Sequence, residues 1–406
     1  MSDDPIIVVG AGQAGLQVAD SLRRGGYNGD LLLVGDEPSL PYQRPPLSKQ
    51  YMVGELADER LLFRPADFYE KKKVAMITGA RVTDLDLAAK AISIDGKTHK
   101  YRKLALTTGA SVRRIPIPGA DNDGVHYLRG LDDARALRAS LAGEKCRIVA
   151  IGGGFIGLEL AAAACELGHK VTVLEAQDRL MGRVVAPLVS DYFLNLHRNH
   201  GVDVALNAGV TRIDKQALGS LNVVLSDARE VEADVVVVGI GSIPNCALAE
   251  AAGLRCENGI VVDEFSQTSD PFVVAAGDCT MHTNARLGVR HRLESVQNAV
   301  DQAKNAAATL LGEGKPYDQI PWFWSDQFDA KLQMVGTSVG YEKVILRGII
   351  AAAAFSCFYF RGRELLGVDS VNRPADHLVS RKLMAARVAV PEYLITDLDR
   401  SLKSLL

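Results

Sequence analysis

The chain has 406 residues, of which 48% are hydrophobic and 23% are charged, and its formal net charge at pH 7 is -3. This length exceeds what one hydrophobic core usually supports, so we expect two or three domains. The near-neutral charge offers no general attraction to nucleic acid or to an anionic membrane, and the acidic amino terminus leaves no room for a secretion signal. We therefore expect a soluble cytoplasmic protein.

The amino-terminal segment has the pattern of a dinucleotide-binding fold. An apolar run at residues 6–9 leads into a motif whose glycines are Gly10, Gly12 and Gly15, and a helical pattern follows. The first glycine permits a tight turn, the second lets a pyrophosphate approach the backbone, and the third allows close packing of helix on strand. The pyrophosphate then meets the positive end of the helix dipole.

An acidic residue completes this first pattern. A second apolar run at residues 31–34 is followed by Asp36, whose carboxylate can accept hydrogen bonds from ribose hydroxyls. Strand, glycines, helix, strand and acid in this order are a far more specific signal than a glycine motif alone.

The same pattern recurs near the middle of the chain. A strand expected at 148–151 leads into Gly152, Gly154 and Gly157, and an alanine-rich helix and a second strand end at Glu175. Two copies in full context indicate two dinucleotide sites in one chain. We assign FAD to the amino-terminal site and NADH to the second site.

The acid of the second copy bears on which nicotinamide nucleotide binds. A carboxylate at Glu175 favours a free 2'-hydroxyl and repels a 2'-phosphate, which predicts a preference for NADH over NADPH. Arg179 lies close in sequence and leaves the strictness of this preference open.

The remaining segments suggest how the domains are arranged along the chain. Apolar runs at 104–110 and 271–279 each end in a glycine turn, and the second turn contains Asp278, which could bond a polyol chain. We therefore expect an α/β fold with two Rossmann-like domains and a carboxy-terminal α+β domain. The FAD-binding domain is expected at 1–112 and 245–320, the NADH-binding domain at 113–244, and the third domain at 321–406.

The spacing of the cysteines and histidines indicates no metal-binding or redox motif. No two of the six cysteines are closer than ten residues, so no Cys-x-x-Cys pair and no zinc or iron–sulfur spacing is present. We therefore expect no metal site and interpret the cysteines as small buried hydrophobes. His197 and His200 lie at an expected helix end, which predicts solvated or capping side chains.

Several longer segments support a family resemblance. They are "PYQRPPLSKQY" (41–51), "HYLRGLDDA" (126–134), "VVAPLVSDYF" (184–193), "AAGDC" (275–279), "RLESVQNAVDQAK" (292–304), "PWFWSDQF" (321–328) and "VNRPADH" (371–377). On these segments the whole chain resembles the NADH-dependent, FAD-containing ferredoxin reductases of bacterial oxygenase systems that are similar to putidaredoxin reductase. The resemblance implies tightly bound, non-covalent FAD, NADH as substrate and a 2Fe-2S ferredoxin as partner.

The resemblance also implies roles for individual residues. The FAD contacts that carry over are Ala14, Asp36, Lys49, Val82, Arg129, Asp278 and Val296. Lys49 would place a cation beside the flavin, and Glu159 would face the nicotinamide and couple to Lys49. Arg44 is a further candidate for the FAD phosphates or adenine.

The two tryptophans of the chain lie in "PWFWSDQ" (321–327). The resemblance places Trp324 near the flavin on the side from which electrons leave, whereas Trp322 is expected to bury into its domain. Candidate cations for docking an acidic ferredoxin are Lys304, Arg381 and Lys382, although a solvated surface would account for Lys382 equally well.

Three functions remain open at this point. The first is an NADH:ferredoxin oxidoreductase that supplies a monooxygenase, of the cytochrome P450 type. The second is a reductase of rubredoxin or of another small redox protein with the same fold. The third is a flavoprotein related to apoptosis-inducing factor, for which the chain lacks long basic or disordered insertions. Thiol chemistry is not expected, because "DEPSLPYQRPPLSK" (36–49), where related enzymes carry a redox cysteine, contains none.

Overall fold

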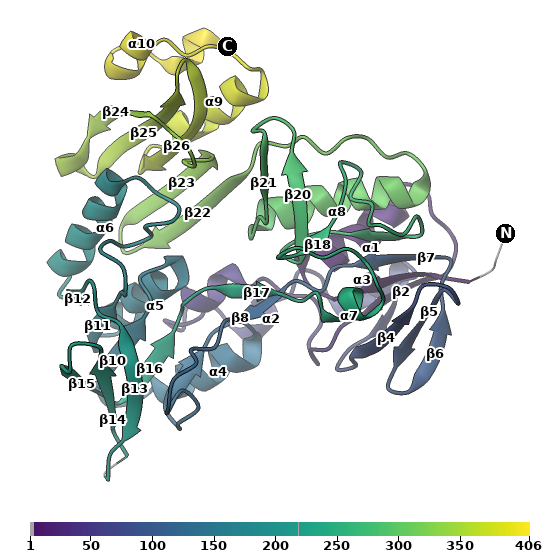
Figure 1. The fold of residues 1–406 in the computed structure, drawn as a ribbon, viewed down its shortest axis with the longest axis horizontal. Helices are drawn as coiled ribbons and strands as arrows, with labels where there is room; N and C mark the ends of the chain where they lie inside the picture. Colours follow the sequence, from purple (N-terminus) through teal and green to yellow (C-terminus); the bar gives the residue numbers. More distant parts are fainter. Residues whose placement is uncertain (1–3, 218) are drawn as a thin grey trace. The chain divides into compact units, whose positions relative to one another are not determined.

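The computed structural model describes residues 4–217 and 219–406, which fold into two compact units (Figure 1). The first unit comprises residues up to Gln43, Asp58–Ser111 and Ile243–Phe323. The second comprises Arg44–Ala57, Val112–Ser242 and Trp324–Leu406.

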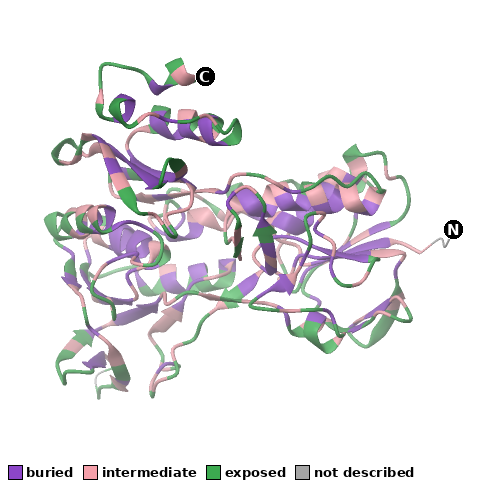
Figure 2. Cartoon of the chain, turned by 45° about the horizontal axis from the view of Figure 1, so that its top comes forward, coloured by how far each residue is buried: buried purple, intermediate pink, exposed green. Residues whose placement is uncertain are grey.

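A five-stranded parallel sheet forms the centre of the first unit. Its strand order is β19-β7-β1-β2-β3. The strands are β1 (Ile6–Val9), β2 (Leu31–Val34), β3 (Ala75–Ile77), β7 (Lys103–Leu106) and β19 (Val273–Ala275). Strands β1 and β19 are buried along their whole length, as expected for a parallel sheet covered on both faces (Figure 2).

Two long helices and several smaller elements complete this unit. Helix α1 (Gln13–Arg24) packs against helix α8 (Val296–Leu311) through alanine- and leucine-rich faces. The small elements are α2 (Asp58–Leu61), α3 (Ala66–Lys71), β4 (Val82–Asp86), β5 (Ala91–Ile94), β6 (Lys97–Lys100), α7 (Ala247–Ala251), β18 (Ile260–Val261), β20 (Thr280–Asn284) and β21 (Val289–His291). Strands β8 (Ala110–Val112) and β17 (Ser242–Pro244) pair where the chain leaves and re-enters this unit.

The second unit contains a second parallel sheet with the same local design. Its strand order is β12-β11-β10-β16-β9. The strands are β9 (Val125–Tyr127), β10 (Arg147–Ile151), β11 (Lys170–Leu174), β12 (Asp203–Ala205) and β16 (Val235–Val238). The helices are α4 (Leu131–Ser140), α5 (Phe155–Glu166) and α6 (Pro187–Asn199), and a separate sheet consists of β13 (Val210–Lys215), β14 (Leu221–Leu225) and β15 (Glu230–Ala233).

The carboxy-terminal region of the second unit is a five-stranded antiparallel sheet with helices. Its strand order is β22-β23-β26-β25-β24. The elements are β22 (Trp322–Gln327), β23 (Ala330–Gly336), β24 (Lys343–Ile349), η2 (Ile350–Ala352), β25 (Ala354–Arg361), β26 (Glu364–Val371), α9 (Pro374–Ala385), α10 (Glu392–Thr396) and η3 (Leu402–Leu405). Phe355, Phe358 and Phe360 on β25 are almost wholly buried.

This architecture confirms the predicted fold class of two Rossmann-like regions and an α+β carboxy-terminal region. Within the described parts of the chain, no helix is both long enough and apolar enough to cross a membrane.

Candidate active site

The first glycine turn has the geometry that a dinucleotide site requires. Gly10 has a φ of +105°, and a Cβ there would lie 2.2 Å from the carbonyl oxygen of Thr107. A Cβ on Gly15 would lie 1.9 Å from the Gly10 oxygen, so the close helix–strand contact needs glycine. At Gly12, by contrast, an added Cβ would meet nothing within 4 Å. The backbone at this position is therefore open to an approaching group.

Helix α1 offers this open position a favourable electrostatic environment. Its N-cap is Gly12, so no side chain caps its first turn, and that turn contains no acidic residue. Backbone N–H groups and the positive end of the helix dipole thus face the open side of the turn. The arrangement fits the pyrophosphate of a dinucleotide.

A second turn lies beside this helix in the same unit. A Cβ on Gly277, whose φ is +87°, would lie 3.1 Å from the Cβ of Ala14. Buried Gln302 holds the turn, because its Oε1 accepts hydrogen bonds of 2.9 Å from the backbone N–H of Gly277 and from the Thr280 hydroxyl. Asp278 is half-buried at the same turn. Sequence reasoning missed Gln302, which lies in the quoted segment 292–304.

Asp36 follows strand β2, as the first pattern predicts. Its carboxylate lies 3.1 Å from the guanidinium of Arg81, which precedes Val82 at the start of β4. Both side chains are exposed, so the pair contributes little to stability. Asp36 is therefore accessible to a ribose hydroxyl.

The second glycine turn repeats the geometry of the first. Gly152 has a φ of +108°, and a Cβ there would lie 2.5 Å from the Gly239 oxygen. A Cβ on Gly157 would lie 2.2 Å from the Gly152 oxygen. Helix α5 has Gly154 as its N-cap and no acidic residue in its first turn. This unit therefore contains its own dinucleotide cradle.

Hydrogen bonds hold Glu175 at the edge of this cradle. Its two carboxylate oxygens accept from the backbone N–H of Gly153 at 2.6 Å and of Gln177 at 2.8 Å. The guanidinium of Arg179 donates to the carbonyl oxygens of Val185, at 2.7 Å, and Gly182. Arg179 is therefore engaged by a backbone loop.

The predicted coupling of Lys49 to Glu159 is present within the second unit. The Lys49 ammonium lies 2.7 Å from Oε2 of Glu159, whose side chain is only 5% exposed. The hydroxyl of Ser48 donates to the same oxygen at 2.6 Å, and the hydroxyl of Ser325 donates to Oε1 at 2.7 Å. Three donors from two distant segments thus satisfy one buried carboxylate.

The hydrogen bonds continue away from Glu159 to a buried histidine. The side-chain amide of Gln327 donates to Ser325 at 3.1 Å, and its Oε1 lies 2.9 Å from Nε2 of His197. Burial lowers the pKa of His197 to about 4, so the ring is neutral near pH 7. With Gln327 oriented this way, His197 Nε2 is the donor, and each donor in the chain points toward Glu159.

This arrangement corrects one sequence expectation. His197 is fully buried and is neither solvated nor a capping group. His200 does lie at the predicted helix end, as the C-cap of α6, and its ring stacks on Phe328 at 3.9 Å. The spacing of the two histidines correctly located the helix end but could not reveal the packing of strand β22 over it.

Two candidate arginines lie together in the second unit. The guanidinium of Arg44 donates to the carbonyl oxygen of Arg129 at 2.9 Å. The backbone N–H groups of Arg129 and Gly130 donate to Asp133, which forms the start of helix α4. The "HYLRGLDDA" segment is thus a helix start that presents Arg129.

The candidate FAD residues are divided between the two units. Those in the first unit are Gly10, Gly12, Ala14, Gly15, Asp36, Val82, Asp278 and Val296, and those in the second are Arg44, Lys49 and Arg129. Val296 is the first residue of α8, where the Ser295 hydroxyl accepts from the backbone N–H of Asn298.

Both tryptophans lie on strand β22 and are half-buried. Because side chains alternate along a strand, Trp322 and Trp324 point to one face, and Ser325 and Gln327 point to the other. Ser325 and Gln327 are fully buried. Trp322, which was expected to bury into its domain, is only half-buried, and the burial of the indole rings does not distinguish it from Trp324.

The three docking candidates are divided between the units. Lys304 is exposed on helix α8 and pairs with Asp301 at 3.0 Å. Arg381 and Lys382 lie on helix α9, where Lys382 is exposed and Arg381 is half-buried.

Comparison with known proteins places this geometry in a family. Residues 4–303 match the model of the pyridine nucleotide-disulphide oxidoreductases, and residues 322–406 match the reductase C-terminal model. The chain belongs to the pyridine nucleotide-disulphide oxidoreductase family.

Individual relatives are similar over nearly the whole chain. Rhodocoxin reductase of Rhodococcus erythropolis is 44% identical over 98% of this chain and 93% of its own. A rubredoxin-NAD(+) reductase of Pseudomonas putida is 38% identical over 91% of this chain and 96% of its own.

Two solved structures match closely in fold. The ferredoxin reductase of the CYP199A2 system of Rhodopseudomonas palustris has a TM-score of 0.96 at 43% identity, covering 99% of each chain. The reductase in a covalent putidaredoxin reductase–putidaredoxin complex also has a TM-score of 0.96, at 39% identity, covering 100% of this chain and 98% of that one.

This oxidoreductase uses FAD and a nicotinamide dinucleotide. The two glycine turns with uncapped helices fit one such group each. Burial raises the pKa of all six cysteine thiols, as expected of inert rather than nucleophilic cysteines.

Proposed function

We propose that the chain is an NADH:ferredoxin oxidoreductase that supplies electrons to a monooxygenase, of the cytochrome P450 type. In the overall reaction, one NADH and two oxidised 2Fe-2S ferredoxins yield NAD⁺, a proton and two singly reduced ferredoxins. The similarity to rhodocoxin reductase and to the ferredoxin reductase of the CYP199A2 system supports this acceptor class.

The observation that carries the proposal is the Lys49–Glu159 pair. It joins the "PPLSK" segment to the helix that begins at the second glycine turn. A buried carboxylate that receives three donors is rigidly positioned, and a rigid charge is what a hydride-transfer site needs. We assign Glu159 to face the nicotinamide and Lys49 to provide a fixed cation beside the flavin.

The first cradle is assigned to FAD. Gly10, Gly12 and Gly15 would admit the pyrophosphate, and Asp36 would bond the ribose. Other proposed contacts are Ala14, Arg44, Lys49, Val82, Arg129, Asp278 and Val296. The chemistry that bound FAD supplies is acceptance of a hydride from NADH and release of electrons one at a time.

The second cradle is assigned to NADH. Gly152, Gly154 and Gly157 would admit its pyrophosphate, and the carboxylate of Glu175 would bond the ribose hydroxyls. Because Arg179 is engaged by carbonyl oxygens, a 2'-phosphate would meet the negative charge of Glu175 without help from this arginine. We therefore propose a preference for NADH.

Trp324 is assigned to the route by which electrons leave. An indole is flat, rigid and apolar, so it can shield a redox centre from water and offer a packing surface to a partner. We propose that an acidic ferredoxin docks near Trp324 with help from Lys304, Arg381 and Lys382. NADH is available in the cytoplasm, which is where we place the reaction.

A rubredoxin is the second candidate acceptor, favoured by the relative that reduces one. A test would mix the purified, FAD-loaded protein with NADH and either a 2Fe-2S ferredoxin, a rubredoxin or a small disulfide, and follow acceptor absorbance. We expect the fastest reduction with the ferredoxin, slowing as salt is added because surface charge steers the encounter. Faster reduction of rubredoxin or of the disulfide would overturn the proposal.

A further inference from the structure

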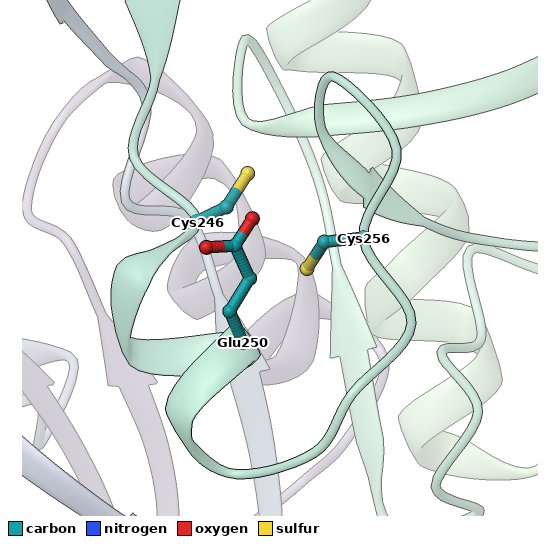
Figure 3. A group of neighbouring side chains, drawn as sticks. All are labelled: Cys246, Glu250 and Cys256. Carbon is teal, nitrogen blue, oxygen red and sulfur yellow. The ribbon is translucent and has the colours of Figure 1, made fainter.

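Two cysteines that are ten residues apart in sequence meet a glutamate in the first unit. The residues are Cys246, Glu250 and Cys256, and their ligand atoms all lie within 4.8 Å of one another. Figure 3 shows the Glu250 side chain on its helix between Cys246 and the facing loop that carries Cys256. None of the three residues belongs to either glycine turn, and the proposed electron transfer does not use them.

The local backbone preorganises the three residues. Cys246 is the N-cap of helix α7, and its carbonyl oxygen accepts the first helical hydrogen bond, of 2.8 Å, from the N–H of Glu250. Cys256 forms an antiparallel β-bridge with Ile260, the first residue of β18. A short helix and a bridged loop thus hold the side chains together, and the sequence spacing does not indicate this meeting.

The three residues differ in burial in a way that would let an ion enter the cluster from solvent. Cys246 is buried, Cys256 is half-buried and Glu250 is exposed, so the cluster opens at the carboxylate. The neighbouring arginines Arg255 and Arg290 both pair with Glu257, each at 2.6 Å. These two arginines are therefore engaged by a carboxylate outside the cluster.

We propose that Cys246, Glu250 and Cys256 form a binding site for one thiophilic divalent ion of the zinc group. Two thiolates and one carboxylate are a donor set that Zn²⁺ and Cd²⁺ accept, with a water molecule completing four-fold coordination. Each thiol gives up its proton on binding, so one bound ion releases two protons.

The loop that carries Cys246 also contacts the segments around the FAD-binding cradle. Asn245, the preceding residue, donates to the carbonyl oxygen of Thr108 at 2.8 Å and accepts from the Thr108 hydroxyl at 2.7 Å. The Cys246 thiol lies 3.9 Å from the carbonyl oxygen of Cys279, next to Asp278. An ion at the cluster would therefore stabilise the loop that contacts both the Thr108 segment and the turn at Asp278.

The affinity is expected to depend on pH. Binding displaces the proton of each thiol, so raising the pH strengthens it.

The test uses tag-free, FAD-loaded full-length protein kept reduced with a phosphine. Zn²⁺ binding is measured by competition with a chromophoric chelator at pH 7 and pH 8. We expect one ion per chain and tighter binding at pH 8. Cys246→Ser and Cys256→Ser should weaken binding by about 100-fold, and Glu250→Gln by about tenfold.

Control variants at other cysteines test whether Zn²⁺ binds at this site and not at another thiol. Cys165→Ser should bind as the wild type does, and so should Cys146→Ser, although Cys146 lies 3.4 Å from Nδ1 of His169. Zn²⁺ should raise the Tm of the wild type and of both control variants but not of Cys256→Ser. Unchanged binding in Cys256→Ser, or loss of binding in either control, would overturn the proposal.

The folding of each variant needs its own check. Cys246 is buried, so Cys246→Ser can fail for structural reasons. Cys256→Ser and Glu250→Gln change less buried positions, and both should retain the flavin spectrum and NADH oxidation without added metal. Absence of Zn²⁺ binding to the wild type at both pH values would also refute the site.

Discussion

The ammonium of Lys49 lies 2.7 Å from Oε2 of Glu159, and the hydroxyl of Ser325 donates a hydrogen bond to Oε1 of the same carboxylate. Segments that are far apart in sequence thus share one buried charge. Breaking such a pair leaves an uncompensated carboxylate and removes the cation assigned to the flavin site. The first prediction follows from this relationship.

Lys49→Ala should slow reduction of the flavin by NADH about 10- to 100-fold, or weaken retention of FAD. Stopped-flow bleaching of the flavin absorbance after NADH addition measures the rate. Lys71→Ala serves as the control, because Lys71 pairs with Asp67 on an exposed helix. Equal rates for wild type and Lys49→Ala, with full FAD content, would contradict the assignment.

Ser325→Ala should loosen Glu159 without removing its charge. The hydrogen bond to Glu159 is lost, and the Gln327 amide loses Ser325 as an acceptor, which together predict a destabilisation of about 2 kcal/mol. If Glu159 faces the nicotinamide, the KM for NADH should also rise. Ser338→Ala is the matched control, because Ser338 donates to the carbonyl of Val184 at an exposed position. A lower Tm with unchanged NADH kinetics would limit Ser325 to a structural role.

The nucleotide preference should follow the charge at Glu175. The double variant Glu175→Ala/Ala176→Arg removes the carboxylate and adds a cation at an exposed position. We expect kcat/KM for NADPH to rise and that for NADH to fall, each by about tenfold. Ala176→Arg alone keeps the carboxylate and controls for the added cation. Equal use of NADH and NADPH by the wild type would show that Glu175 does not determine the nucleotide preference.

Substitution of the two tryptophans should have different effects, although both side chains are half-buried. Trp324→Ala should leave reduction of the flavin by NADH nearly unchanged and weaken ferredoxin reduction about tenfold. Trp322→Ala should mainly lower the Tm, because its strand begins the antiparallel sheet. Steady-state ferredoxin reduction and thermal unfolding, measured on both variants, compare the two effects. Equal loss of stability with normal electron transfer in both would refute the split.

The buried carboxyl of Asp369 should make stability depend on pH. Burial raises its pKa from 3.8 to about 7, although the Tyr359 hydroxyl donates to it. Between these values the unfolded chain loses the proton while the folded protein keeps it, so stability falls as pH rises from about 4 to about 7. Asp369→Asn should remove this component.

The Tm measured at pH 5, 6, 7 and 8 for wild type and Asp369→Asn isolates the effect. The difference in Tm between the two proteins should change steadily up to about pH 7 and then level off. Asp203→Asn, at an exposed strand position, is the control. A constant difference across this range would show that Asp369 is ionised in the folded protein.

Local patterns in the sequence were enough to predict the two glycine turns and the strands and helices that flank them. Both strand–glycine–helix patterns appear where predicted, as β1 with α1 and β10 with α5, because glycine turns and strand periodicity depend on neighbouring residues. The α+β character expected of the carboxy-terminal region is likewise present, in strands β22 to β26 and helices α9 and α10. The pairing of Lys49 with Glu159 came from family resemblance, since no local pattern joins the two segments.

Only the tertiary structure decided which distant side chains meet. Strand β22 turns Ser325 and Gln327 to its buried face, and this packing brings Ser325 to Glu159 and Gln327 to His197. The same is true of Cys246 and Cys256, whose meeting depends on a helix and a bridged loop. Sequence spacing reports distances along the chain, whereas these contacts depend on how faces of separate elements pack, and that is a property of the whole fold.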